Sequence, residues 1–301
     1  MKNYLGLDIG GTKIAAGIVS ADGTIHVKTR VETEAHLGMD GVLHNIEEAV
    51  SELGVDVVDG IGIGFAGQID RKKGVVIYSP NMPTFRNIAL VEAVRNRFGK
   101  ILSEKKSPIV IDNDANAFAL AEHTVGHGQG TQYFVAITIG TGVGGGVVVD
   151  GKIYHGSAFA SELGHMTIEV DGRECSCSLK GHLEAYVSGL SIQKMYYEKT
   201  GDNKQAFDIE KVALKDNNSP EHYVYMKSGK YLGIGLASVV NLLDPEMIVI
   251  GGGVGRSRLL IEQARDVCYN NIFFKGRRPE ILQSKLSNDA AIIGTAMLCH
   301  D

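Results

Sequence analysis

The chain has 301 residues, of which 44% are hydrophobic and 22% are charged, a balance typical of a folded protein with a full core. The net charge of −5 provides no basic surface for nucleic acid or an anionic membrane, and four cysteines are too few for a disulfide framework. No apolar run approaches the ~20 residues that a membrane helix requires, and no signal-peptide pattern follows Met1, so we expect a cytoplasmic protein.

The first half of the chain begins with three short strand patterns and continues with helices and strands in alternation. Strands are expected over residues 4–8, 14–19 and 24–28, followed by an amphipathic helix over 40–53. The strand over 57–65 alternates glycine with large apolar residues, so one of its faces is bare and suits close packing or a ligand. The remaining patterns are a turn-rich loop over 79–83, a helix over 90–98, a short buried strand over 108–111 and a helix over 115–123.

The second half also opens with a strand pair that helices follow. Its patterns are a strand from Tyr133, helices over 184–199, 206–214 and 221–243, a buried strand over 247–250 and an apolar helix over 290–299. Strands that alternate with helices after an initial meander predict an α/β protein. No low-complexity linker is present, so we expect a hinge near 115–130 between an N-terminal domain, 1–115, and a C-terminal domain, 116–289.

Two glycine-rich hairpins of the same design lie far apart in the sequence. Each has a strand, a turn of glycine and threonine, a second strand and an Asp-Gly reversal. Backbone N–H groups approach phosphate closely only where no Cβ intervenes, so both turns suit a polyphosphate held between two halves. Ordinary tight hairpins in a β-rich domain are the alternative. The phosphate-binding candidates are Gly10, Gly11, Thr12, Lys13, Thr138, Gly140, Thr141 and Gly142.

Asp8 precedes the first of these turns and does not fit a phosphate contact, because a carboxylate repels phosphate. Beside a nucleoside triphosphate it suits Mg²⁺, bound directly or through water. A third glycine turn, made of Gly251, Gly252 and Gly253, follows a buried strand. It could lie flat against an adenine or a ribose, or it could be a plain strand-to-helix turn.

A polar strand end precedes the helix expected from residue 115. Ligands of α/β proteins bind at the carboxyl ends of strands, so Asp114 is a candidate general base for a hydroxyl that attacks a γ-phosphate. Asn113 could orient that hydroxyl. Asp and Asn are also favoured helix caps, and their spacing alone does not separate the two roles.

Four residues with metal-ligand chemistry occur in one segment: His165, Cys175, Cys177 and His182. Two imidazoles and two thiolates have the number and type of ligands of a closed, structural Zn²⁺ site. Two free thiols near two surface histidines are the alternative. Glu162 and Glu184 lie in the same segment and could accept hydrogen bonds from sugar hydroxyls, although surface glutamates are common.

Taken together, these stretches resemble the ROK family, which contains bacterial-type sugar kinases and sugar-responsive repressors. Residues 162–184 are the most specific match. The matching segments extend over nearly the whole chain in the family's order: 8–13, 62–67, 80–81, 113–116, 140–146, 162–165, 175–184, 244–245 and 250–253.

The resemblance implies the two-domain α/β fold of actin and hexokinases, which is ribonuclease H-like, with a cleft between the domains. It also implies that the last helix, about 290–301, packs back on the N-terminal domain. The protein would transfer phosphate from ATP to the 6-hydroxyl of glucose or a related hexose, or alternatively of N-acetylglucosamine or N-acetylmannosamine. A homodimer is the family-level expectation, and polyphosphate stays open as an alternative donor.

Residue by residue, the resemblance implies that Asp114 is the catalytic base and that Asp8 holds Mg²⁺. The glycine turns would form the nucleotide cradle, with residues 251–253 on the adenosine side. His165 would place one ring nitrogen on zinc and the other toward a sugar hydroxyl. The sugar contacts would be Asn81, Asn113, Asp114, Glu162, His165 and Glu184.

The chain departs from the family pattern at two places. The last cysteine of the metal motif is replaced by His182 and a glycine by Ser178, so retention of zinc is an expectation to test. The segment 80–85 reads Pro-Asn-Met-Pro-Thr-Phe where Pro-Asn-Leu-Pro-Gly-Trp is usual, which leaves the hexose open.

Two other classes of function are alternatives to the kinase. A repressor of this family needs a DNA-binding segment before the first hairpin, and Asp8 leaves little room for one. A binding protein with the actin fold and no kinase activity would leave the grouping of Glu162, His165 and Glu184 unexplained.

Overall fold

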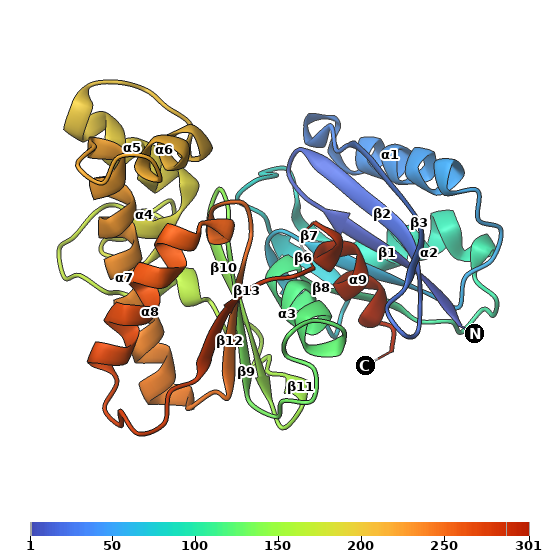
Figure 1. Ribbon diagram of the computed structural model, residues 1–301. Helices are drawn as coiled ribbons and strands as arrows, with labels where there is room; N and C mark the ends of the chain where they lie inside the picture. The colour runs from blue at the N-terminus through green and yellow to red at the C-terminus, as the bar shows by residue number, and fades with distance from the viewer. Residues whose placement is uncertain (1, 287, 301) are drawn as a thin grey trace. The chain divides into compact units, whose positions relative to one another are not determined.

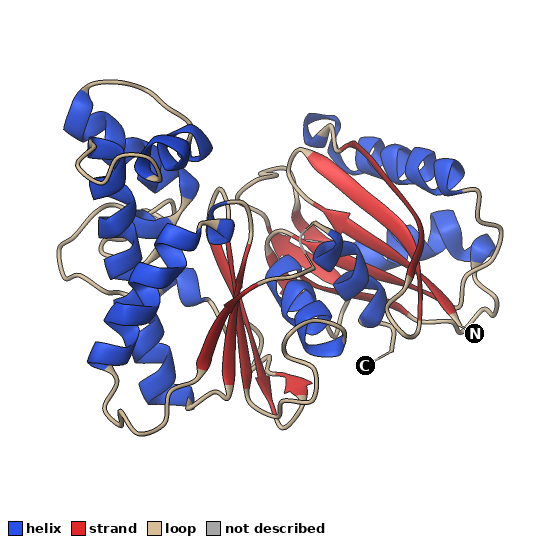
Figure 2. Ribbon diagram, in the orientation of Figure 1, coloured by secondary structure: helices blue, strands red, loops and turns tan. Residues whose placement is uncertain are grey.

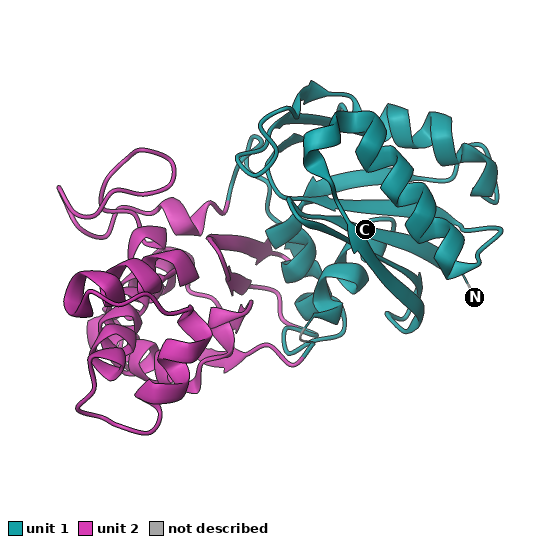
Figure 3. Ribbon diagram, turned by 90° about the horizontal axis from the view of Figure 1, so that it is seen from above, with its two compact units in different colours: residues 1–130, 152–160, 286–301 teal, residues 131–151, 161–285 magenta. Residues whose placement is uncertain are grey.

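The computed structural model describes residues 2–286 and 288–300. The chain divides into two compact units (Figure 3). Unit 1 comprises Met1–Gly130, Lys152–Ala160 and Leu286–Asp301, and unit 2 comprises Thr131–Gly151 and Ser161–Lys285. The boundary expected between residues 115 and 116 falls inside a helix that belongs wholly to unit 1.

The main sheet of unit 1 has the strand order β3-β2-β1-β4-β8 (Figures 1 and 2). Its strands are β1 (Asn3–Ile9), β2 (Lys13–Ser20), β3 (Ile25–Glu32), β4 (Gly60–Phe65) and β8 (Ile109–Asn113). The first three form an antiparallel meander, and β4 and β8 run parallel to β1. The expected α/β class is therefore confirmed, including the meander at its start.

The register of the parallel strands brings acidic residues to one edge of this sheet. Asp8 pairs with Gly64, and Gly64 pairs with Asp112 on the next strand. Asp114 follows two residues later, at the start of α3 (Asp114–Thr124). Because parallel strands end at the same edge, two acidic positions that are far apart in sequence become neighbours in unit 1.

Helices cover the two faces of this sheet in different ways. Apolar side chains of α1 (Gly38–Leu53) and α2 (Leu90–Phe98) pack on the face that carries the large residues of β1 and β4. The opposite face is lined by glycines, and α9 (Asp289–Met297) lies directly against it, beside α3. The bare face that the sequence indicated is thus used for close helix packing. Buried residues shared by the first face include Leu5, Leu7, Ile46, Ile61, Ile63 and Val94.

Several short elements complete unit 1. The small antiparallel sheet β5 (Gln68–Asp70), β6 (Val75–Tyr78) and β7 (Arg86–Ile88) was not expected from the sequence, because strands of three or four residues carry little periodic signal. The other short elements are the 3₁₀ turns Ala35–Leu37 and Gly99–Ile101 and the strand β11 (Lys152–Ile153).

Unit 2 contains a sheet in which β10, β9, β12 and β13 are consecutive neighbours. β9 (Phe134–Ile139) and β10 (Val143–Val149) form an antiparallel hairpin, and β12 (Met247–Gly251) is parallel to β9 and to β13 (Glu280–Gln283). This hairpin and β12 carry the second and third glycine turns of the sequence.

Helices account for most of the remainder of unit 2. The pattern expected over 184–199 is two helices, α4 (Glu184–Val187) and α5 (Gly189–Thr200), because the Ser188 side chain caps a new helix. Helix α7 (Pro220–Leu243) begins at the Ser219 cap with proline in its first turn, and it packs along α8 (Arg258–Asn271). The other helices are α6 (Ala206–Ala213) and the 3₁₀ turns Leu163–His165 and Val254–Arg256. Within the described residues, no helix is both long and apolar enough to cross a membrane.

The contact between β4 and α9 gives a test of the packing in unit 1. A Cβ added at Gly62 would collide with the backbone of Thr295 on α9, so Gly62→Ala should destabilise unit 1 by about 3 kcal/mol. Chemical unfolding followed by circular dichroism measures this loss. Gly99→Ala is the matched control, because a Cβ there meets nothing within 4 Å and its φ of −58° is helical. Equal stability of the two variants would contradict the packing described.

Candidate active site

The joint between β8 and α3 separates the two roles that the sequence left open. Asn113 is the N-cap of α3: its Oδ1 accepts a hydrogen bond from the backbone N–H of Ala115 at 2.8 Å. Its Nδ2 donates to the carbonyl of Gly67 at 3.1 Å, which fixes the side chain at both ends. Asp114 is the first residue of the helix itself. The capping function therefore belongs to Asn113.

The first glycine turn lies between β1 and β2 in the same unit. The N–H of Gly10 donates to the carbonyl of Lys13 at 3.0 Å, which closes the turn. A Cβ added at Gly11 would lie 2.9 Å from the Cβ of Asn81, so Asn81 contacts this turn. The Nζ of Lys13 lies 3.8 Å from a carboxylate oxygen of Glu32, and this pair is well exposed. Asn81 thus contacts the first glycine turn, whereas the side chain of Lys13 pairs with Glu32.

Asp8 precedes this turn in β1, and the pKa of its carboxyl group is raised. Burial is the main cause, and the nearby charge of Asp114 adds to it, so the pKa of Asp8 rises to about 7, while Arg30 acts in the opposite direction. Two carboxyl groups that repel one another in a partly enclosed place favour a cation between or beside them. The donor set of unit 1 therefore fits a divalent cation at Asp8.

The second glycine turn lies in unit 2 and is held by a carboxylate. The N–H of Gly140 donates to the carbonyl of Gly142 at 2.9 Å, and the N–H of Val143 donates to Oε2 of Glu184 at 2.9 Å. A Cβ at Gly142 would lie 2.6 Å from the same oxygen, so a larger residue there would displace the Glu184 carboxylate from this contact. The sequence did not indicate this contact, which joins residues 41 positions apart.

The third glycine turn lies next to the second. Gly251 pairs with Thr138, and Gly252 adopts a φ of +84° with its Cα against the backbone of Ile139. Cβ atoms added at Gly140 or Gly253 would meet nothing within 4 Å. Unit 2 therefore presents two adjoining stretches of backbone without side chains, as a nucleotide cradle requires.

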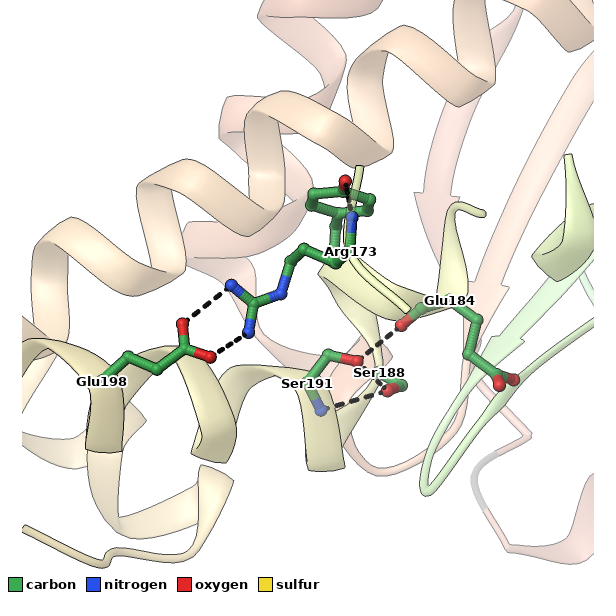
Figure 4. A network of polar contacts seen from close by, with 6 residues as sticks. Arg173, Glu184, Ser188, Ser191 and Glu198 are labelled. Carbon is green, nitrogen blue, oxygen red and sulfur yellow. Dashed lines mark hydrogen bonds and ion pairs between the residues drawn. The ribbon is translucent and has the colours of Figure 1, made fainter. Parts of the chain in front are cut away.

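The backbone at Glu184 is fixed by a polar network (Figure 4). The Oγ of Ser191 donates to the carbonyl of Glu184 at 2.8 Å, and the Oγ of Ser188 accepts from the N–H of Ser191 at 3.2 Å. Nearby, Arg173 makes two hydrogen bonds of 2.8 Å with the carboxylate of Glu198. These contacts hold the start of α4 and the loop before it in one arrangement.

His165, Cys175, Cys177 and His182 form a cluster whose potential ligand atoms all lie within 4.8 Å of one another. Nδ1 of His165 is 3.3 Å from Nδ1 of His182, and the Sγ of Cys177 is 3.2 Å from the latter. Such a donor set fits a metal ion. Burial is the main cause that raises the pKa of Cys175 to about 11, so without a metal this thiol is neutral.

Ser178, which replaces a glycine of the family pattern, keeps the left-handed backbone conformation that glycine favours. Ser178 has a φ of +69°, and its N–H donates to the carbonyl of Cys175 at 2.9 Å. The departure noted in the sequence therefore costs some backbone strain but preserves the turn. Glu162 is exposed at the other end of this segment, where its carbonyl accepts from the N–H of His165 at 3.0 Å.

Comparison with known proteins places these features in one family. The ROK family profile matches residues 4–301. The chain belongs to the ROK family. The glucokinase of Thermotoga maritima is 33% identical, over 99% of this chain and 97% of that protein. The N-acetyl-D-glucosamine kinase of Aliivibrio fischeri is 30% identical, over 98% of both.

The solved structures of ROK proteins agree with this assignment. A ROK family glucokinase from Streptomyces griseus, in complex with glucose and AMPPNP, has a TM-score of 0.84 and 30% identity, over 98% of both chains. The ROK hexokinase from Thermus thermophilus has a TM-score of 0.85 and 30% identity, over 99% of this chain and 98% of that one. The expectation of the hexokinase-like α/β fold is confirmed by this likeness.

Within this ROK chain, the predicted site residues fall into two groups. Unit 1 holds the strand-end acids, the first glycine turn and the two asparagines: Asp8, Gly10, Gly11, Thr12, Lys13, Asn81, Asn113 and Asp114. Unit 2 holds the other glycine turns, the two glutamates and the metal cluster: Thr138, Gly140, Thr141, Gly142, Glu162, His165, Cys175, Cys177, His182, Glu184, Gly251, Gly252 and Gly253. Asp112, which was not singled out from the sequence, is buried and lies two residues before Asp114.

The raised pKa of Asp8 gives a pH-dependent prediction for the protein without divalent cations. A carboxyl whose folded pKa lies near 7 costs no stability below the unfolded pKa of 3.8, and the cost grows as the pH rises toward 7. Asp8→Asn should therefore match the wild type near pH 4 and exceed its unfolding free energy above pH 7, by on the order of 2–4 kcal/mol.

Urea unfolding at several pH values in the presence of a chelator measures this difference. Asp22→Asn is the control, because Asp22 is an exposed carboxylate whose pKa is lowered, chiefly by Ser20. A difference between Asp8→Asn and the wild type that does not change with pH would show that Asp8 is not held in this way.

Proposed function

We propose that this protein is an ATP-dependent kinase that phosphorylates the 6-hydroxyl of a hexose, with glucose as the first candidate. The observation that carries the proposal is the joint at β8 and α3, where Asn113 caps the helix and the charge of Asp114, the next residue, acts on the pKa of Asp8. A base near a carboxyl group that suits a cation and near a glycine turn is what phosphoryl transfer to a hydroxyl needs. The glucokinase names of the relatives support the same reaction.

In this proposal Asp114 accepts the proton of the sugar hydroxyl while the hydroxyl oxygen attacks the γ-phosphate in line. Asn113 stays fixed by its two hydrogen bonds and can present its amide to the same sugar. Asp8 would hold Mg²⁺, which when bound neutralises charge on the phosphates. Backbone N–H groups of the first two glycine turns would donate to the phosphate oxygens, and Gly251–Gly253 would lie along the adenosine.

The sugar would be held by residues that carry amide, carboxylate or imidazole groups. Glu184 can do this while it accepts from Val143, because each carboxylate oxygen has two lone pairs. Asn81 lies against the first glycine turn and would link that turn to the sugar. The proposed contacts are Asn81, Asn113, Glu162, His165 and Glu184. They would serve N-acetylglucosamine or N-acetylmannosamine as well, and a homodimer is proposed on the family resemblance.

The function is tested by measuring ADP release with Mg-ATP over a panel of glucose, mannose, fructose, allose, N-acetylglucosamine and N-acetylmannosamine. The wild type should turn over at least one sugar strongly, and Asp114→Asn should lose at least about 10³-fold in kcat, because the base is removed. Calorimetry should show that the variant still binds the same sugar with an affinity close to that of the wild type.

Asp150→Asn serves as the control for loss of one carboxylate, since Asp150 contacts Tyr133 on the exposed side of unit 2. Full activity of Asp114→Asn would remove the proposed base. Absence of turnover on every sugar, with polyphosphate tried as donor, would leave the actin-fold binding protein as the better interpretation.

We also propose that the His165, Cys175, Cys177 and His182 cluster binds a structural Zn²⁺. Four protein ligands leave no position for water, so the ion would hold the loop rather than take part in the reaction. His182 is buried and its Nδ1 faces both His165 and Cys177, so imidazole can replace the usual thiolate.

Zinc content provides the test of this site. The wild type should carry about one zinc per chain by elemental analysis, His182→Ala should lose it, and His182→Cys should retain it, because a thiolate also binds zinc. The melting temperature of the wild type should fall on chelation and that of His182→Ala should not. His222→Ala is the control, since His222 lies outside the cluster. Equal zinc in the wild type and His182→Ala would exclude this ligand set.

A further inference from the structure

A buried carboxylate lies two residues before the proposed base, and no part of the proposed reaction uses it. The side chain of Asp112 is only 4% exposed. Its Oδ1 accepts from the backbone N–H of Asn113 at 2.7 Å and from Nδ2 of Asn116 at 2.9 Å. Its Oδ2 lies 2.6 Å from Nε2 of His155 and 3.5 Å from Nε of Arg71. Both oxygens are engaged by protein groups, so the contacts of Asp112 are those of a residue that holds the joint in place.

These contacts hold the joint that carries Asp114 from both sides. Asn113 precedes the base and Asn116 lies two residues after it, and one oxygen of Asp112 binds both. Its other oxygen is held by the imidazole of His155 at 2.6 Å and, at the longer distance of 3.5 Å, by the guanidinium of Arg71, so His155 makes the closer of the two contacts that orient the carboxylate. A shift of the carboxylate would therefore move the backbone N–H of Asn113 and the first turn of α3 together.

His155 reaches this joint from a distant part of the sequence. It belongs to Lys152–Ala160, the segment that unit 1 takes from between two stretches of unit 2. Only Ile153 in this segment is buried, and most of its other side chains are exposed, whereas His155 is 24% exposed. The imidazole is thus one of the few side chains that fasten this segment, and it does so on Asp112.

We propose that His155 is a positioning residue for phosphoryl transfer, because it orients Asp112 and thereby fixes the strand–helix joint that carries Asp114. The inference rests on the proposed kinase function. It assigns to His155 an effect mainly on the chemical step, since Asn113 is the one proposed sugar contact in the joint that Asp112 holds. Displacement of a reacting group by about 1 Å can cost on the order of 100-fold in rate.

The test compares His155→Gln with His155→Asn. The amide nitrogen of glutamine can take the place of Nε2 and donate to Asp112, whereas asparagine is shorter by one bond and falls short. His155→Asn and His155→Ala should lower kcat by about 10- to 100-fold, with the KM for the sugar changed by less than about twofold. His155→Gln should restore kcat to within about threefold of the wild type. Lys152→Ala, an exposed change in the same segment, is the control.

Three results would overturn the inference. The first is a kcat of His155→Asn equal to that of the wild type. The second is an equal loss in His155→Gln and His155→Asn that follows their loss of melting temperature, which would make the contact purely structural. The third is a rise in KM with kcat unchanged. If the wild type itself shows no turnover, the proposed kinase function fails. That outcome differs from the three above, which all require an active wild type.

Discussion

Parallel pairing of β1, β4 and β8 is the constraint on which the proposed chemistry of unit 1 depends. The register sets Asp8 opposite Gly64 and Gly64 opposite Asp112, so β1 and β8, on either side of β4, each carry an acidic residue one position before the strand end, at the same edge. Electrostatic repulsion between Asp8 and Asp114 follows directly from this pairing. That repulsion makes the edge receptive to a cation.

The sequence predicted those features that depend on local pattern. The helices at 38–53 and 220–243 and the glycine turns follow from periodicity and from the absence of a Cβ. The choice between cap and base at Asn113 and Asp114 did not, because both residue types suit both roles and only the start of the helix, with Asn113 as its N-cap and Asp114 as its first residue, distinguishes them. The short strands of 68–88 have too few residues for a period to be visible.

Contacts across long stretches of sequence were also beyond prediction. His155 reads as an isolated histidine, and nothing near it indicates a partner 43 residues away. Glu184 was expected as a sugar contact from its place in the family motif, but its hydrogen bond to the second glycine turn required the fold. The grouping of His165, Cys175, Cys177 and His182 was easier to foresee, because the four residues lie within one short segment of the sequence.

The place of α9 in the chain has a consequence for synthesis. This helix covers the glycine face of the first sheet, yet it is translated after the whole of unit 2. During translation, the glycine face of β1, β4 and β8 therefore has no covering helix until α9 has been synthesised. By that time the elements of unit 2 have all been synthesised. Unit 2 can reach its native state first, and chaperones that bind exposed sheet surfaces would meet unit 1 during this interval.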